Sequence, residues 1–307
     1  MDNLCHTLTG AALGEAGLKH RTRFGNAALM IAANLPDIDA LAFLSETPHV
    51  ALRRGWTHGI VAQLLLPVAL AGLMVLIDRW RPPASAGARR VRPAAMLALC
   101  YAGVLSHVGL DWLNSYGVRL LMPFSTSWFY GDAVFIVDPW LWGALLAGVV
   151  LARRRGSTAP ARVALALASA YIAVMVLSAA AARERVVQAW TAVHRRSPVA
   201  LMVGPVPVNP MRRAIIVDAG QYYREGSFSW WPPRVEFDPE RTPKRVEHPA
   251  VLDAVKDPDF LAVLSWSRFP RFQVQPVQGG TSVTLTDMRF GTRLAAVTTV
   301  VPDQRAP

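Results

Sequence analysis

Cysteine is scarce in this chain, with only Cys5 and Cys100 among 307 residues. Two cysteines provide neither a disulfide framework nor the paired thiolates of a structural zinc site. We expect both to be small apolar side chains in the interior. Charge is also sparse, because charged residues make up 17% of the sequence and hydrophobic residues 52%. A soluble domain usually carries more charge, so we predict that part of the chain lies in a membrane.

Two further features are missing from the sequence. The chain begins Met1-Asp2-Asn3 without a basic stretch, so we expect no cleavable signal peptide. The formal net charge is +11, yet the basic residues form no single patch. They cluster between apolar runs, at 19–23, 79–92 and 153–155. This is the positive-inside pattern of a membrane protein, and it argues against a nucleic-acid partner.

Apolar segments fill the first 182 residues. We expect a short helix over 3–18 and apolar stretches at 24–44, 60–78, 94–113, 139–152 and 161–182. Pro36 interrupts the second of these, and backbone groups freed at membrane depth must be buried or line a cavity. The sequence therefore predicts a mainly helical, multi-pass bundle with about five to six membrane helices. Because the basic clusters fall at alternate connections, we place them on the cytoplasmic side and everything after about residue 183 outside.

The pattern changes after about residue 190. Alternating or β-branched runs occur at 199–208, 213–223, 272–277 and 281–289, and 249–264 is typical of a helix interrupted by Pro258. We predict a helical transmembrane domain over 1–185 and a small, extracytoplasmic α+β domain over 190–307. The second domain would serve as a lid, a substrate guide or a surface for a protein partner. We expect Trp230-Trp231 to be packed in its interior, and contact with the membrane interface is the alternative.

Ionisable residues recur within the apolar segments. His107 and Asp111 are four residues apart, so on a helix they share one face. Such groups are costly in an apolar segment unless they are paired or bind an ion. With a rise of about 1.5 Å per residue from the basic clusters, ionisable residues of separate segments fall in one layer toward the outer leaflet. These residues are His6, Asp37, Asp39, His107, Asp111 and Asp138, with His58 just above them.

The shared layer predicts a metal centre, although capping or packing would explain each residue taken alone. The expected ligands are His6, Asp37, Asp39, His58, His107 and Asp111. Imidazoles and carboxylates without thiolates suit a divalent metal: zinc first, then manganese or iron. Six groups exceed what one tetrahedral zinc needs, so a two-metal site is also open.

Three residues are predicted to take part in catalysis: Asp37, Arg54 and Asp138. The guanidinium of Arg54, or that of Arg53, can hold a phosphate or carboxylate oxygen with two hydrogen bonds. Asp138, or alternatively Asp132, can orient a ligand histidine from behind. A metal ion would lower the pKa of a bound water and supply a nucleophile at neutral pH.

Several short motifs occur in order along residues 1–182. After His6 come Leu35-Pro36-Asp37-Ile38-Asp39, Arg54-Gly55-Trp56-Thr57-His58, Ser106-His107-x-x-Leu110-Asp111, Asn114-Ser115-Tyr116-Gly117, Pro123-Phe124-Ser125 and Val137-Asp138-Pro139. In this combination the chain resembles the YdjM-type membrane-bound metal-dependent hydrolases. Residues 285–290 show a weaker resemblance to the same family. The resemblance implies a protein of the bacterial-type inner (cytoplasmic) membrane with hydrolase activity. Some relatives are described as binding a regulatory protein, which implies a non-enzymatic role as the alternative.

Three functions follow as hypotheses. The first is a membrane hydrolase that cleaves an ester or phosphoester of a lipid or lipid-linked substrate with metal-activated water. The second is a binding or regulatory membrane protein with a structural metal or polar site. The third is a transporter, but the cytoplasmic halves of the apolar segments are nearly all apolar, which argues against an ion path.

Overall fold

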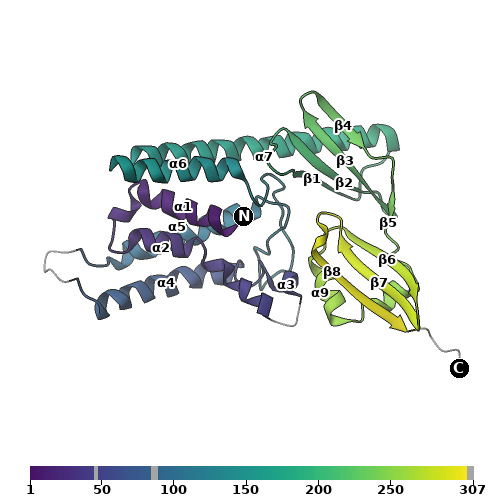
Figure 1. The fold of residues 1–307 in the computed structure, drawn as a ribbon, viewed down its shortest axis with the longest axis horizontal. Coiled ribbons are helices and arrows are strands. Elements are labelled where there is room, and N and C mark those ends of the chain that lie inside the picture. Colours follow the sequence, from purple (N-terminus) through teal and green to yellow (C-terminus); the bar gives the residue numbers. More distant parts are fainter. Residues whose placement is uncertain (45–47, 84–88, 303–307) are drawn as a thin grey trace. The chain divides into compact units, whose positions relative to one another are not determined.

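The computed structural model describes residues 1–44, 48–83 and 89–302 (Figure 1). The chain separates into two compact units. The first comprises Met1–Asp39, Arg54–Ala179 and Pro205–Pro210, and the second comprises Ala40–Arg53, Ala180–Gly204 and Met211–Pro307. The first unit is helical and the second contains all of the named strands except the last residue of β1.

The helices of the first unit follow the predicted apolar stretches. They are α1 (Asn3–Glu15), the 3-10 helix η1 (Leu18–His20), α2 (Gly25–Ala32), the 3-10 helix η2 (Leu35–Leu44), α4 (Ile60–Trp80), α5 (Pro93–Trp112), α6 (Pro139–Arg155) and α7 (Ala159–His194). The ends of η2 and α7, at 40–44 and 180–194, belong to the second unit. Within the described ranges, α4, α5 and α7 are long and apolar enough to cross a membrane. The pair α2 and η2, bent by 47°, passes the same test when taken together. The five to six spans that we predicted are not confirmed, since α1 has 13 residues and α6 has 17.

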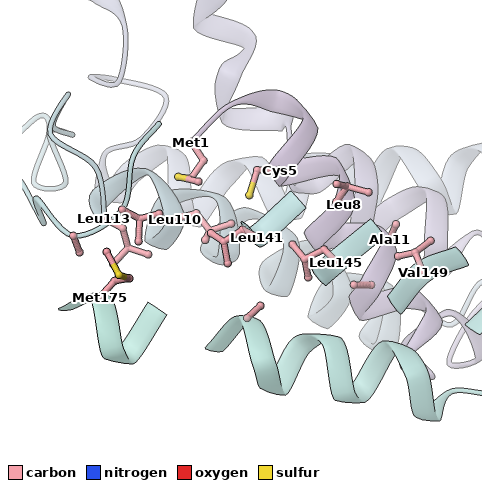
Figure 2. Close-up of a cluster of buried hydrophobic side chains, with 14 of the residues drawn as sticks. Met1, Cys5, Leu8, Ala11, Leu110, Leu113, Leu141, Leu145, Val149 and Met175 are labelled. Atoms are coloured by element: carbon pink, nitrogen blue, oxygen red, sulfur yellow. The ribbon is translucent and has the colours of Figure 1, made fainter. Parts of the chain in front are cut away.

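Apolar side chains from α1, α5, α6 and α7 form one core of the helical unit (Figure 2). Cys5 and Leu8 of α1 lie there with Leu110, Leu141 and Met175. A second core lies between α2, α4 and α5 and includes Cys100. Both cysteines are buried and form no disulfide, which confirms the prediction that they are small apolar side chains in the interior.

Two glycines let α2 approach its neighbours closely. A Cβ atom at Gly10 of α1 would lie 2.7 Å from the carbonyl oxygen of Leu29. A Cβ atom at Gly103 of α5 would lie 2.5 Å from the Cβ of Ala32. Contacts of this kind are typical of helices that associate in membranes through small residues. They bring the C-terminal end of α2 against α5, which positions the site described below.

The second unit contains two antiparallel sheets and three short helices. One sheet has the order β1 (Ala200–Pro205), β2 (Arg212–Asp218), β3 (Tyr222–Trp230), β4 (Pro233–Phe237), with β5 (Thr242–Pro243) also on β3. The other has the order β6 (Pro270–Val277), β7 (Gly280–Asp287), β8 (Gly291–Pro302). The helices are α3 (His49–Leu52), α8 (Pro249–Ala254) and α9 (Pro258–Trp266). The predicted α+β character of this part is confirmed.

Three details of this unit differ from the sequence prediction. The helical region expected over 249–264 is divided at Pro258 as predicted, but the break extends over 255–257, where the carboxylate of Asp257 caps α9. The last membrane helix was expected to end near residue 182, but α7 continues to His194 because Ala182, Val186 and Trp190 pack in the core with β1 to β3. Trp230 packs edge-on against Phe228, whereas Trp231 is 83% exposed. The expected burial of the tryptophan pair is therefore wrong for Trp231.

Within residues 285–290, Asp287 and Arg289 form a buried ion pair in the second unit. Asp287 accepts hydrogen bonds from Ser267 Oγ at 2.7 Å and from the backbone N–H groups of Arg268 and Phe269. Arg289 Nε lies 2.8 Å from the same carboxylate. Burial acts to raise the pKa of Asp287, but Arg289 and these hydrogen bonds together hold it below the usual range.

A depressed native pKa makes the stability of this unit depend on pH. The stabilisation from Asp287 is complete above the unfolded-state pKa of about 4 and is lost as the pH falls through the lower native value. We expect Asp287→Asn to lower the free energy of unfolding by about 1.5–3 kcal/mol at neutral pH and to flatten its dependence on acid. Thermal unfolding of the detergent-solubilised chain between neutral pH and about pH 3 measures this. Asp253→Asn, a partly exposed aspartate in the same unit, is the control and should change neither quantity.

Candidate metal centre

Four ionisable side chains meet inside the helical unit. Asp37 comes from η2, His58 from the loop before α4, and His107 and Asp111 from α5. One ligand atom from each residue lies within 4.8 Å of all the others, and all four residues are buried. The i, i+4 spacing places His107 and Asp111 on one face of α5. Asp37 and His58, from two other segments, lie next to them.

The separations within this cluster match those of ligands around one metal ion. His58 Nε2 lies 3.1 Å from His107 Nε2 and 3.2 Å from Asp111 Oδ2. His107 Nε2 lies 3.6 Å from Asp111 Oδ2 and 3.8 Å from Asp37 Oδ1. Ligands of a tetrahedral zinc, with bonds of about 2.0–2.1 Å, lie about 3.3 Å from one another. Small movements would therefore suffice for the four atoms to bind one ion.

The partners of the two imidazoles decide which ring nitrogen faces the centre. His107 Nδ1 lies 2.7 Å from the carbonyl oxygen of Ala33, and a carbonyl can only accept, so Nδ1 carries the proton. His58 Nδ1 lies 2.9 Å from Thr57 Oγ1 and 3.4 Å from Asp39 Oδ2, which favours a proton there too. The two Nε2 atoms face each other at 3.1 Å, a separation at which both can bind one metal ion.

The break between α2 and η2 explains the position of His107. The carbonyl of Ala33 follows the end of α2, and His107 satisfies it. Asn34 Nδ2 donates to the carbonyl of Met30 at 2.9 Å and satisfies a second group of the same turn. The expectation that backbone freed near Pro36 is buried holds for these groups. It also makes this break the element that orients a candidate ligand.

The chemistry of the side chains favours a divalent cation in this pocket. Three buried carboxylates, those of Asp37, Asp39 and Asp111, lie within 3.8 Å of an imidazole nitrogen of His58 or His107. The guanidinium of Arg54 and the amino group of Met1 contact Asp111. Imidazole nitrogens and carboxylate oxygens without thiolates are ligands of zinc, manganese and iron, so the residues fit a divalent metal.

Arg54 lies within the centre. Its terminal nitrogen donates to Asp111 Oδ1 at 2.9 Å, and its Nε forms an ion-pair contact with Oδ2 at 2.8 Å. The guanidinium also donates to Asn114 Oδ1 at 3.0 Å and stacks over the ring of Tyr116. The backbone of Arg54 has a φ of 54°, a strained conformation for this residue. Hydrogen bonds from its N–H to Asp39 and from the N–H of Arg119 to its carbonyl hold it there.

His6 lies beside the cluster. Its ring stacks on that of His107 with centroids 3.8 Å apart, and its Nε2 is 3.3 Å from Asp111 Oδ1. The Nδ1 atom of His6 is buried and has no hydrogen-bond partner among the described residues. The structure therefore brings His6 to the site but not into the group of four, and its role as a ligand stays a prediction.

Asp39 and Asp138 lie elsewhere than the prediction placed them. Asp39 sits behind His58, where it accepts from the N–H of Arg54 at 2.7 Å and from Thr57 Oγ1 at 2.9 Å. Asp138 caps α6 through the N–H groups of Trp140 and Leu141 and accepts from the hydroxyl of Tyr171 at 2.9 Å. Asp39 thus has the orienting position that we expected of Asp138. The structure gives Asp138 the contacts of a helix cap, as its place before Pro139 would also suggest.

The position of Asp39 leads to a measurable difference between the two aspartates. We expect Asp39→Asn to weaken metal binding by about 10–100-fold, because the variant loses the carboxylate that orients His58. Asp138→Asn is the matched control and should leave metal affinity unchanged. Titration of the chelator-treated protein with zinc measures both. Equal affinities for the two variants would contradict the assigned positions.

Sequence reasoning did not identify four residues around the centre. Ala33 contributes only its carbonyl oxygen, which no side-chain pattern can reveal. Thr57, Asn114 and Tyr116 contact His58 or Arg54, and all three occur in the motifs quoted above. These three residues are close in sequence to His58 or Asp111, and this proximity is the signal that could have identified them.

Comparisons with known proteins concern mainly this helical part. The family described as YdjM inner membrane protein matches residues 1–182, which include every residue of the cluster. The uncharacterized protein YfhP of Bacillus subtilis (strain 168) is 25% identical over 169 residues, which are 51% of this chain and 48% of that protein. The chain therefore spans about half the length of this curated relative. No solved structure matches the chain.

Proposed function

This chain belongs to the YdjM inner membrane protein family, and from the buried cluster in its family-matched part we propose that it is a membrane-embedded, metal-dependent hydrolase. The substrate in this proposal is an ester or phosphoester of a lipid or lipid-linked molecule. The observation that carries it is the convergence of Asp37, His58, His107 and Asp111, with two imidazole nitrogens beside carboxylate oxygens in a buried pocket. Zinc fits this set of nitrogen and oxygen ligands, and manganese or iron are the alternatives.

In this proposal the residues around the cluster have separate roles in orienting the ligands and stabilising charge. Ala33 and Asp39 hold the two imidazoles in the orientation that points Nε2 inward. Arg54, paired with Asp111, provides the positive charge that stabilises an oxygen on which negative charge develops. A bound divalent ion supplies a water molecule of lowered pKa as the nucleophile. The low polarity around the site strengthens each of these interactions.

The placement in the membrane is part of the proposal. The apolar segments cross the bilayer several times, with the basic clusters at 19–23, 79–92 and 153–155 in the cytoplasm. The site then lies toward the outer leaflet and the second unit is extracytoplasmic. Cysteine accessibility labelling of intact cells, with single cysteines introduced at Ser85 and Ser282, tests this. We expect a membrane-impermeant reagent to label the second position only.

The hydrolase proposal is tested by activity that follows the metal. Detergent-purified protein is incubated with a panel of phospholipids and lipid-linked phosphates, and product release is measured before chelation, after chelation and after return of zinc. We expect activity that is lost on chelation, returns with zinc and is absent from His107→Ala. Activity that persists in the metal-free protein would contradict the proposal.

One observation favours a second function, that of a binding or regulatory protein. Arg54 already holds both oxygens of Asp111, and every residue of the cluster is buried, so a metal here can also act as a structural ion. The second unit would then recruit the protein partner. In that case a variant lacking residues 190–307 loses the cellular function, while a folded His107→Ala protein keeps it.

A further inference from the structure

A groove of about 500 Å³ runs along the helical unit beside the metal cluster. Thr7 of α1, Asn34 and Asp37 provide its polar lining. Ile31 of α2 and Ile38 of η2 are among its apolar lining residues. The groove therefore forms where α2 ends and the chain bends by 47° into η2.

Asp37 belongs both to the lining of the groove and to the metal cluster. It lines the groove, and its Oδ1 atom lies 3.8 Å from His107 Nε2 within the cluster of four. The other three members of the cluster are fully buried, whereas Asp37 keeps 7% of its surface exposed. A molecule in the groove would therefore reach the metal cluster past Asp37.

The two sides of the groove differ in polarity. Ile31 and Ile38 are 43% and 51% exposed, and both belong to the bent helix pair that is apolar enough to cross a membrane. Exposed isoleucines on such a segment suit acyl chains. On the polar side, Asn34 Nδ2 donates to Thr7 Oγ1 at 2.9 Å and to the carbonyl of Met30. Because this nitrogen is engaged, the amide oxygen of Asn34 is the atom that can accept a hydrogen bond from a ligand hydroxyl.

We propose that this groove binds a glycerophospholipid from the surrounding bilayer, with an acyl chain against Ile31 and Ile38 and the polar linkage beside Asn34 and Asp37. This assignment rests on the proposed hydrolase function, because it names the substrate class and the side from which the substrate enters. Entry is lateral, from the membrane between α1 and the bent pair. A lipid in this position places its ester and phosphoester groups next to the residue that leads to the metal cluster.

The test uses a phosphatidylglycerol that carries a photoactivatable diazirine on one acyl chain, in vesicles of phosphatidylethanolamine and phosphatidylglycerol. After illumination, mass spectrometry maps the labelled peptides of the full chain. We expect label on residues 30–38 in the wild-type protein and also in His58→Ala, because the groove does not require the metal and His107 still binds the carbonyl of Ala33 at the bend after α2. Ile31→Trp and Ile38→Trp fill the groove and should reduce this label severalfold, whereas Leu64→Trp on the exposed side of α4 should not.

Two results would overturn the groove assignment. One is label on 30–38 that is no stronger than label on the exposed side of α4. The other is label that excess soluble glycerol phosphate removes, since this would identify a soluble phosphoester as the occupant. Metal content shows whether the tryptophan variants are folded, and Ile38→Ser, which makes the groove polar without filling it, should also reduce the label. Failure of the hydrolase proposal appears separately, as intact groove labelling without product release.

Discussion

Replacing His107 by alanine should remove the metal from the protein. Loss of a residue that orients a metal ligand typically weakens metal binding by about 10–100-fold, so loss of a ligand should weaken it by more than about 100-fold. His107 contributes the Nε2 atom that lies within 3.8 Å of three other ligand atoms, so its loss removes a ligand atom that is close to all the others. We expect His58→Ala to have an effect of the same size. Elemental analysis and zinc titration of the purified variants measure these losses.

Two other histidines serve as controls for this prediction. His20→Ala, at an exposed position, should keep the wild-type affinity. His6→Ala should weaken binding less than His107→Ala, because His6 contacts the cluster through Asp111 and the ring of His107. If His107→Ala retained metal at the wild-type affinity, the cluster would not be the binding site.

The second large effect concerns the buried pair of Arg54 and Asp111. Asp111→Leu leaves the guanidinium of Arg54 buried without its carboxylate, and such a change destabilises proteins by about 3–5 kcal/mol. Arg54→Met in the same chain removes the remaining charge, so the double variant should recover most of this loss. Thermal unfolding in detergent, with chelator present to exclude the metal, measures the single and double variants.

Comparing the single and double variants separates the effect of the buried charge from the effect of lost packing. Asp111→Asn keeps the shape of the side chain and should fall between the wild type and Asp111→Leu. A double variant less stable than Asp111→Leu would show that Arg54 stabilises the helices by contacts other than this ion pair. Stacking on Tyr116 and the bond to Asn114 are the contacts that would then matter.

The sequence predicted the convergence of the site better than the role of each residue. Helical rise from the basic clusters placed Asp37, His107 and Asp111 at one depth, and these three do meet. Depth along a helix does not define the direction in which a side chain points around it. Asp138 therefore shared the predicted layer while capping α6, and Asp39 lay behind His58 although only two residues separate it from Asp37.

The fold was predictable where local chemistry determines it. Apolar runs located α4, α5 and α7, and Pro258 marked the division between α8 and α9. The length of α7 was not predictable from hydropathy, because its last turns are stabilised by packing against a sheet formed later in the chain. The bend after α2 was signalled by Pro36, but the bond between His107 and Ala33 that stabilises it depends on tertiary structure.

The central claim is that Asp37, His58, His107 and Asp111 bind one divalent metal ion. X-ray absorption spectroscopy on detergent-purified protein, with the metal content of the same sample, tests it most directly. We expect about one metal ion per chain, with two imidazole nitrogens and carboxylate oxygens at about 2.0–2.2 Å. A protein purified without chelator that contains no metal and binds none when zinc is added would contradict the account.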